Sequence, residues 1–402
     1  MNNTKIFLTG TARGGTQIVA KMLSANENVN IATGPLLEIL RLQRNLVLNK
    51  FDNKKYSLSS TSKLPFQDYY YSDESIKILD LVMNLSANVK LSKNIWKKHL
   101  NIVKKRTSIE NQDLVKHINK IYNPNFTKLI SNCFEVLKTT RNLRKNKIIG
   151  ILDWWIIEMF LPLAKSIKNS KFIVIIRDPR ASIASHTKKK YKGSVANSLS
   201  FIRCWRKMIA FTIYYKSLKI FKNRLCVVTH EDLLENPKKI CKKLCNFLNV
   251  KFESEMLNTA NYLDYSTGKI WQGNSSFENK TFGFKKKRAN RWRKELSYSE
   301  IRAIEFIAHH ELKLLNYKLY KNNSFSELKN GLSLLINDDQ KKRKWKTSTK
   351  KTEFNYGVEF FRNYIFNVNS VEKDENLLRR LFLFKEVYKK IRGKKIIFRS
   401  GV

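Results

Sequence analysis

The chain has 402 residues, of which 42% are hydrophobic and 12% aromatic, so it can bury a large core and is not a disordered chain. Its 13 glycines and six prolines are too few for a loop-rich β architecture. Lys and Arg number 78 against 33 Asp and Glu, which gives a formal net charge of +45. This excess indicates either a surface that faces polyanions or a general bias toward Lys, Asn and Ile. The bias explains much of the lysine but not the scarcity of acids.

The cysteines and the N-terminal residues indicate the cellular compartment that we expect. The five cysteines form no paired framework, and Cys241 and Cys245 share the apolar stripe of a predicted helix, which is typical of core thiols. Such usage suits a reducing compartment. Strand-like residues begin at Lys5 with no apolar region before them, and no apolar stretch approaches membrane-spanning length. We therefore expect a cytoplasmic protein.

The first predicted element is a buried strand, because residues 6–8 are continuously apolar. Gly10, Gly14 and Gly15 follow and allow the backbone to turn tightly and to approach a ligand. Residues 16–23 then have the spacing of an amphipathic helix. The order of strand, glycine loop and helix is typical of a phosphate site, although the lysine of a nucleoside-triphosphate P-loop is missing.

The charge around this loop favours an anion. A helix that starts near Gly15 or Thr16 directs its free N–H groups and the positive end of its dipole into the loop. Arg13 adds a permanently charged guanidinium beside them. The alternative is a strand–helix turn that binds nothing.

Four further strands are predicted along the chain, each followed by a polar turn or a helix. They lie in "NVNIATG", "KNKIIGILDW", "KFIVII" and "RLCVVT". Strands that alternate with helices predict a three-layer α/β/α fold around a central parallel sheet, with ligands at the carboxyl ends of the strands. Residues 75–145 read as a helical, lysine-rich insertion into this pattern.

A second anion site is predicted after the strand "KFIVII". Arg177 stands at the end of this strand, and Ser185 follows eight residues later in the first turns of the next helix. A guanidinium and a hydroxyl beside a helix N-terminus suit a second phosphate.

Together these motifs resemble the family of sulfotransferases that use PAPS (3′-phosphoadenylyl sulfate), closest to bacterial and carbohydrate-type members. The loop 10–17 stands where the family cradles the 5′-phosphosulfate, and "RDPRASIAS" matches its 3′-phosphate motif. "VVTHEDLLENPKKICKKLCNFLNV" looks like the strand, turn and helix that follow. "GNSSF" with "RANRWRKELSYSEIRAIE" is similar to the segment that closes over the cofactor. The resemblance spans about residues 4–318 and implies a catalytic domain over 1–320 with a P-loop NTPase-like fold.

The resemblance implies roles for individual residues. Arg13 stands where the family places lysine or arginine and would stabilise the charge on the bridging oxygen as the sulfuryl group leaves. Arg177 and Ser185 would bind the 3′-phosphate, joined by Arg291 from the closing segment. Four loop residues would cradle the 5′-phosphate: Gly14, Gly15, Thr16 and Gln17. Because PAPS needs two anion sites and no magnesium, we expect PAPS as donor, PAP as product and no metal.

The general base is less clear from the sequence. Many relatives place a glutamate directly after a Gly-Pro turn that follows the second strand, but here Leu36 has that place and Glu38 comes two residues later. Relatives often carry lysine at the end of the third strand, where this chain has Asp153. Glu38 and Asp153 are therefore the two candidates for the base.

Two functions remain open at this point. The first is transfer of a sulfuryl group from PAPS to a hydroxyl, less commonly an amine, of an acceptor that we expect to be a carbohydrate, with an acidic glycan suggested by the charge. The second is a polyanion- or nucleic-acid-binding protein on a degenerate P-loop scaffold. The basic runs are scattered and no known nucleic-acid module is present, so we expect no specific nucleic-acid partner.

Residues 321–402 lie beyond the family pattern and read as a basic, mainly helical extension. "NDDQKKRKWKTSTKKTEF" has the composition of a solvated linker, and "ENLLRRLFLFKEVYKKI" that of a terminal basic amphipathic helix. Such a helix can pack on the domain, contact a membrane surface or mediate self-association.

Overall fold

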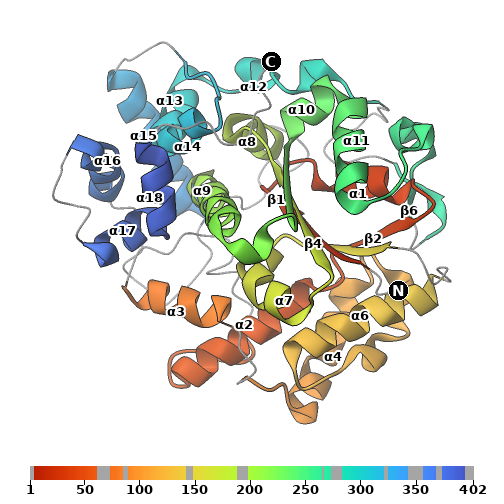
Figure 1. Cartoon of the computed structure of the whole chain (residues 1–402). Helices are drawn as coiled ribbons and strands as arrows, with labels where there is room; N and C mark the ends of the chain where they lie inside the picture. The colour runs from red at the N-terminus through yellow and green to blue at the C-terminus, as the bar shows by residue number, and fades with distance from the viewer. Residues whose placement is uncertain are drawn as a thin grey trace.

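The fold is built on a parallel five-stranded sheet with the strand order β2-β3-β1-β4-β5 (Figure 1). The computed structural model describes residues 4–60, 73–84, 89–141, 148–187, 198–264, 267–272, 283–320, 325–342, 356–367 and 374–393. The strands are β1 (Lys5–Gly10), β2 (Val29–Thr33), β3 (Ile148–Leu152), β4 (Ser170–Ile176) and β5 (Leu225–Thr229). Each of the five lies where the sequence predicts a strand.

Strand β1 is central, and this determines what surrounds the glycine loop. Phe7 is in register with Ile151 of β3 on one side and with Phe172 of β4 on the other. The loop after β1 therefore lies between the turns after β3 and β4, at the edge of the sheet where ligands of such folds bind.

Both faces of the sheet are covered by helices, which confirms the three-layer α/β/α prediction. In β1, Phe7 belongs to one hydrophobic core whereas Ile6 and Leu8 belong to the other, as the alternation of a strand requires. Figure 1 shows α1 and α11 on one side and α7 and α9 on the other. The covering helices are α1 (Thr16–Ser24) and α11 (Pro237–Leu248) on the first face, and α6 (Phe126–Thr140), α7 (Phe160–Ser166) and α9 (Ser198–Ser217) on the second. Cys241 and Cys245 are buried on α11, as expected of core thiols.

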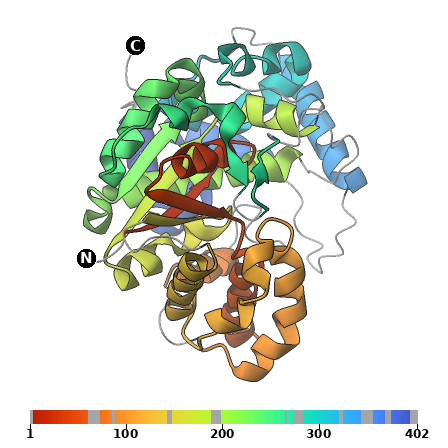
Figure 2. The same ribbon diagram turned by 90° about the vertical axis from the view of Figure 1, so that its right-hand side faces the viewer.

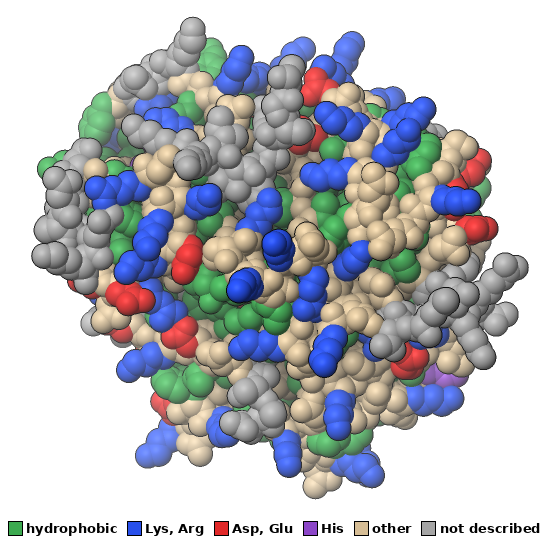
Figure 3. Space-filling model, viewed as in Figure 1, with side chains coloured by type: hydrophobic (Ala, Val, Ile, Leu, Met, Phe, Trp, Pro, Cys, Tyr) green, Lys and Arg blue, Asp and Glu red, His purple; other side chains and the backbone are tan. Residues whose placement is uncertain are grey.

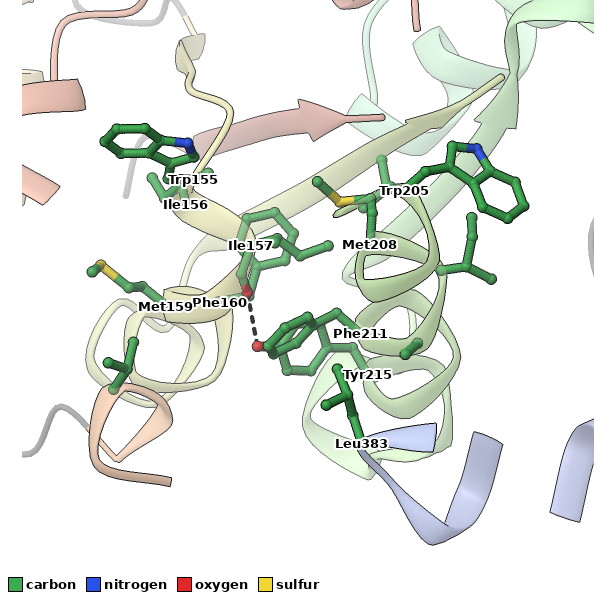
Figure 4. Close-up of a cluster of buried hydrophobic side chains, with 14 of the residues drawn as sticks. Trp155, Ile156, Ile157, Met159, Phe160, Trp205, Met208, Phe211, Tyr215 and Leu383 are labelled. Carbon is green, nitrogen blue, oxygen red and sulfur yellow. Dashed lines mark hydrogen bonds between the residues drawn. The ribbon is translucent and has the colours of Figure 1, made fainter. Parts of the chain in front are cut away.

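The core under β4 is rich in aromatic side chains. Figure 4 shows Phe211 and Tyr215 of α9 packed toward Phe160, with Leu383 of the C-terminal extension beside them. The Tyr215 hydroxyl donates a hydrogen bond of 2.8 Å to the carbonyl of Ile157. This contact satisfies the only polar atom of a buried tyrosine side chain.

The chain between β2 and β3 is helical and lies at the bottom of the molecule in both ribbon views (Figures 1 and 2), as a cluster that shares one hydrophobic core with a face of the sheet. Its elements are α2 (Leu37–Phe51), α3 (Asp73–Met83), α4 (Lys93–Thr107), α5 (Gln112–Val115), η1 (Ile118–Ile121) and α6. The cluster is attached to the sheet at β2, where the Asn111 side chain donates to the carbonyl of Thr33 (2.5 Å). Arg141 donates to the side chains of Asn30 and Asn111 (2.8 and 3.0 Å). These bonds fix α4 and α5 at the carboxyl end of β2.

The remaining elements up to residue 320 are mostly short helical segments and two two-residue strands. They are η2 (Ile156–Met159), α8 (Pro179–Thr187), η3 (Lys219–Phe221), α10 (His230–Glu235), η4 (Ser254–Leu257), η5 (Thr259–Asn261), β6 (Leu263–Asp264), β7 (Lys269–Ile270), η6 (Lys286–Arg288), α12 (Trp292–Glu295), α13 (Tyr298–Ile307) and α14 (His309–Leu314). Among the described residues, no helix is long and apolar enough to cross a bilayer.

The C-terminal extension packs on the domain. Its elements are α15 (Phe325–Lys342), α16 (Tyr356–Tyr364), η7 (Ile365–Asn367), α17 (Glu375–Phe382) and α18 (Lys385–Arg392). The single terminal helix expected over 375–391 is two helices, because Leu383 adopts a φ of 65° and breaks the run. The expected linker begins inside α15, and its part from residue 343 onward lies outside the described residues. The boundary at 320 stays a prediction, since 321–324 are not described either.

The apolar side of the last two helices is covered by the domain. Leu378, Phe382, Val387 and Tyr388 are each at most 2% exposed and belong to the main core. The apolar side chains that a membrane contact through this segment would need are therefore buried in the structure.

Candidate functional site

The glycine loop leads into α1 with its first turn open. Gly15 caps the helix in the left-handed region (φ 82°), no side chain caps it, and its first turn holds no acidic residue. The Gly14 N–H donates to Thr11 within the loop (2.8 Å), whereas Thr16 is buried and Gln17 half-buried in the first turn. An anion that binds here meets unpaired backbone donors and the positive end of a helix.

The two predicted anion sites adjoin each other, because Arg13 contacts Ser185 and Arg177 contacts Arg13. The Nε and Nη2 atoms of Arg13 lie 3.4 and 3.5 Å from the Ser185 hydroxyl oxygen. Nη1 of Arg177 donates to the carbonyl of Arg13 (2.8 Å). Arg13 itself has a positive φ of 58°, an unusual conformation for a residue with a Cβ that is typical of functional loops.

The backbone of Arg177 is fixed by hydrogen bonds at both its N–H and its carbonyl, and one guanidinium nitrogen has no hydrogen-bond partner. Its backbone N–H donates to Thr11 Oγ1 (3.1 Å), and its carbonyl accepts from the Trp205 indole (2.7 Å). Burial lowers the pKa of Arg177, and the carboxylates of Glu231 and Asp178 offset part of this effect, so the side chain stays charged. Its Nε is buried without a hydrogen-bond partner, which an oxygen of a bound anion would satisfy.

His230 also belongs to this site, and our sequence reasoning missed it. It is the first residue of α10, directly after β5. Its Nδ1 lies 2.3 Å from the position that a Cβ on Gly15 would occupy, so a side chain at position 15 would collide with it and residue 15 must be glycine. The side chain is 8% exposed, and Nδ1 has no partner. Burial, then the charges of Arg177 and Arg288, hold the pKa of His230 well below its usual value, so the imidazole is neutral at pH 7. Its place at the carboxyl end of a strand was the signal that could have revealed it.

The closing segment lies against the same region, and the role of Arg291 at the 3′-phosphate stays a prediction. Arg291 forms an ion pair with Glu295 of α12. Arg288, three residues earlier, is the arginine of this segment whose charge acts on His230. The "GNSSF" part of the expected segment lies outside the described residues.

Comparison with known families decides the identity. The model of the sulfotransferase family matches residues 5–254, from β1 to η4. The chain belongs to the sulfotransferase family. The match contains the loop, the Arg177 turn and His230, whereas the closing segment and the C-terminal extension of this sulfotransferase lie beyond it.

Several solved structures are similar to this sulfotransferase. The sulfotransferase domain from the curacin biosynthetic pathway is 16% identical, with a TM-score of 0.45 over 80% of this chain and 99% of that one. The sulfotransferase domain from the Synechococcus olefin synthase is 16% identical, with a TM-score of 0.42 over 74% and 89%. A sulfotransferase from Mycobacterium avium is 11% identical, with a TM-score of 0.38 over 79% and 78%.

The two carboxylates that the sequence nominates as base lie at the ends of β2 and β3. Glu38 is in the first turn of α2 and forms an ion pair with Arg41. Asp153 follows β3 and is 1% exposed; its Oδ2 has no partner. Burial raises the pKa of Asp153 to about 7, although the N–H groups of Trp155 and Leu36 oppose the shift. In the described part of the sulfotransferase, no three His, Cys, Asp or Glu side chains gather as a metal site.

Proposed function

We propose that this sulfotransferase moves a sulfuryl group from PAPS to a hydroxyl group of a carbohydrate. The main support for PAPS as the sulfuryl donor is a pair of contacts beside the open N-terminus of α1. Arg13 contacts Ser185, and Arg177 contacts Arg13. PAPS carries a phosphosulfate and a separate 3′-phosphate, and two cationic motifs that adjoin each other suit both groups. His230, neutral and without a partner, supports a further polar contact to the donor.

The residues divide the chemistry between them. Arg177 and Ser185 hold the 3′-phosphate, and the first turn of α1 holds the 5′-phosphate. Arg13 stabilises the negative charge that develops on the bridging oxygen when its bond to sulfur breaks. The acceptor oxygen forms the new bond to sulfur, the electron pair of the broken bond stays on the phosphate of PAP, and a base takes the acceptor proton.

The charge of the chain supports an acidic glycan as acceptor. Figure 3 shows Lys and Arg side chains over the whole visible face, with fewer Asp and Glu between them. A surface of this kind attracts a polyanion from many directions and does not define one groove.

The experiment is transfer of labelled sulfate from PAPS to a panel of acidic glycans, neutral sugars and small phenols, at several salt concentrations. We expect transfer to glycans, with a KM for acidic members that rises steeply with salt, because their contacts are largely ionic. A flat salt profile would contradict the acidic acceptor. Binding of polyanions without any transfer would instead favour the alternative of a binding protein on a degenerate P-loop scaffold.

A further inference from the structure

The turn after β2 supplies no carboxylate to the site. Gly34, Pro35 and Leu36 form this turn, and Leu36 is fully buried in the apolar core. The turn nevertheless lies near the loop: the Gly34 N–H donates to the Leu152 carbonyl (2.7 Å), and the Asp153 N–H donates to the Leu8 carbonyl (3.1 Å). These bonds connect the end of β2 through β3 to the end of β1, where the glycine loop starts.

A carboxylate reaches this turn from the helical insertion. Glu110 follows α4, and its Oε2 lies 2.3 Å from the position that a Cβ on Gly34 would occupy. Gly34 also has a φ of 64°, so both its conformation and its neighbour require glycine. Oε2 of Glu110 is shielded from solvent and has no hydrogen-bond partner, and the nearest guanidinium nitrogen, of Arg106, is 3.8 Å away.

The backbone that carries Glu110 is fixed to the sheet. The Glu110 N–H donates to the Thr107 carbonyl (3.3 Å), and the next residue, Asn111, donates to the Thr33 carbonyl at the end of β2. Arg141 holds the Asn111 side chain from the other side. A base needs such a rigid support, because proton transfer depends on a short and well-aligned hydrogen bond.

Charged groups from four elements face the Glu110 carboxylate. Burial raises the pKa of Glu110; Arg106 of α4 and Lys21 of α1 oppose the shift, and Asp264 of β6 adds to it. Asp153, after β3, is a further carboxyl neighbour of Glu110. A carboxylate with a raised pKa is a stronger base than an ordinary glutamate.

Exposure separates the three candidate carboxylates. Glu110 is 23% exposed at its side chain, whereas Asp153 is 1% exposed. Glu38 is 11% exposed at its side chain and forms an ion pair with Arg41. Glu110 is thus the most exposed of the three carboxylates, and one of its oxygens has no hydrogen-bond partner.

We infer that Glu110 is the general base, supplied by the helical insertion in place of the carboxylate that the turn after β2 lacks. The inference rests on the proposed function. Glu110 accepts the proton of the acceptor hydroxyl as the acceptor oxygen bonds to sulfur, and PAP leaves with the electron pair of the broken sulfur–oxygen bond.

The test is Glu110→Gln, with Glu135→Gln as a matched control, because Glu135 is an exposed glutamate on the same insertion. We expect Glu110→Gln to lower kcat by about a hundredfold or more, the usual scale of general-base loss. Its affinity for PAP and its Tm should stay near those of the wild type. The rise of wild-type kcat/KM with pH should be lost, and Glu110→Asp should restore part of the rate. The control should behave as the wild type.

Two results would count against the inference. A normal kcat for Glu110→Gln, with the loss appearing instead in Glu38→Gln or Asp153→Asn, overturns it and leaves sulfotransfer from PAPS intact. A wild-type protein that transfers no sulfate from PAPS overturns the proposed function itself, and the inference with it.

Discussion

Replacing Arg177 with alanine is expected to weaken PAP binding by about tenfold to a hundredfold or more, because hydrogen bonds to charged groups contribute roughly 1.5–3 kcal/mol each. Arg177 is fixed by the Arg13 carbonyl, by Thr11 and by Trp205, and its unpaired Nε is free to bind an oxygen of the 3′-phosphate. The affinity for 5′-AMP, which lacks that phosphate, should change little. Isothermal titration calorimetry with both nucleotides measures the difference.

Two control variants show whether the loss of PAP affinity comes from the charge of Arg177, from the shape of its guanidinium or from the removal of any arginine. Arg177→Lys keeps the charge but loses the planar fork, so its PAP affinity should be intermediate. Arg293→Ala removes an exposed arginine that stacks on Trp292 of the closing segment, and it should bind PAP as the wild type does. If Arg177→Ala weakened PAP and AMP equally, Arg177 would not be a 3′-phosphate ligand.

Replacing Glu359 with alanine is expected to lower the free energy of unfolding by about 3–5 kcal/mol, the usual result of removing one partner from a buried ion pair. Glu359 of α16 and Arg206 of α9 are 1% and 0% exposed at their side chains, with an N–O distance of 2.5 Å. Arg206 holds the pKa of Glu359 below its usual value in spite of burial. This stabilisation is present above the ordinary glutamate pKa and is lost as the pH falls through the lowered one. Urea unfolding at pH 7 measures the loss.

A double variant controls for the loss of packing. Arg206→Met with Glu359→Leu replaces the pair by apolar side chains and should recover most of the stability, since neither charge is then left unpaired in the core. A change below about 1 kcal/mol in Glu359→Ala, the scale of an exposed ion pair, would contradict the burial of α16. The C-terminal extension would then not be part of the same folded unit.

The sheet and the loop could be predicted because their signals are local. Five apolar runs, each followed by a polar turn, indicate parallel strands wherever the chain places them. Arg13, Arg177 and Ser185 could be nominated as site residues for a related reason, since the carboxyl ends of parallel strands meet at one edge. The same rule also covers His230, which directly follows a strand in "VVTHEDLL" and was overlooked.

Other features depend on packing and have no local signal. Glu110 lies in a helical insertion, and long-range bonds, such as those of Asn111 to Thr33 and of Arg141 to Asn111, bring its carboxylate to Gly34. The break at Leu383 is equally hidden, because the amphipathic pattern continues through it. That pattern correctly indicates which side of the terminal helices is apolar, but it does not indicate the surface that covers this side.

The central claim is that the loop and the Arg177 turn together bind one nucleotide that carries phosphates at both the 3′ and the 5′ positions of its ribose. Calorimetry of the wild-type protein with PAP and with 5′-AMP, in a buffer that contains EDTA, tests it most directly. The account predicts a Kd for PAP that is micromolar or lower and at least about tenfold below that for AMP, since each 1.4 kcal/mol corresponds to a factor of ten. Equal affinities for the two nucleotides, or PAP binding that requires added magnesium, would contradict it.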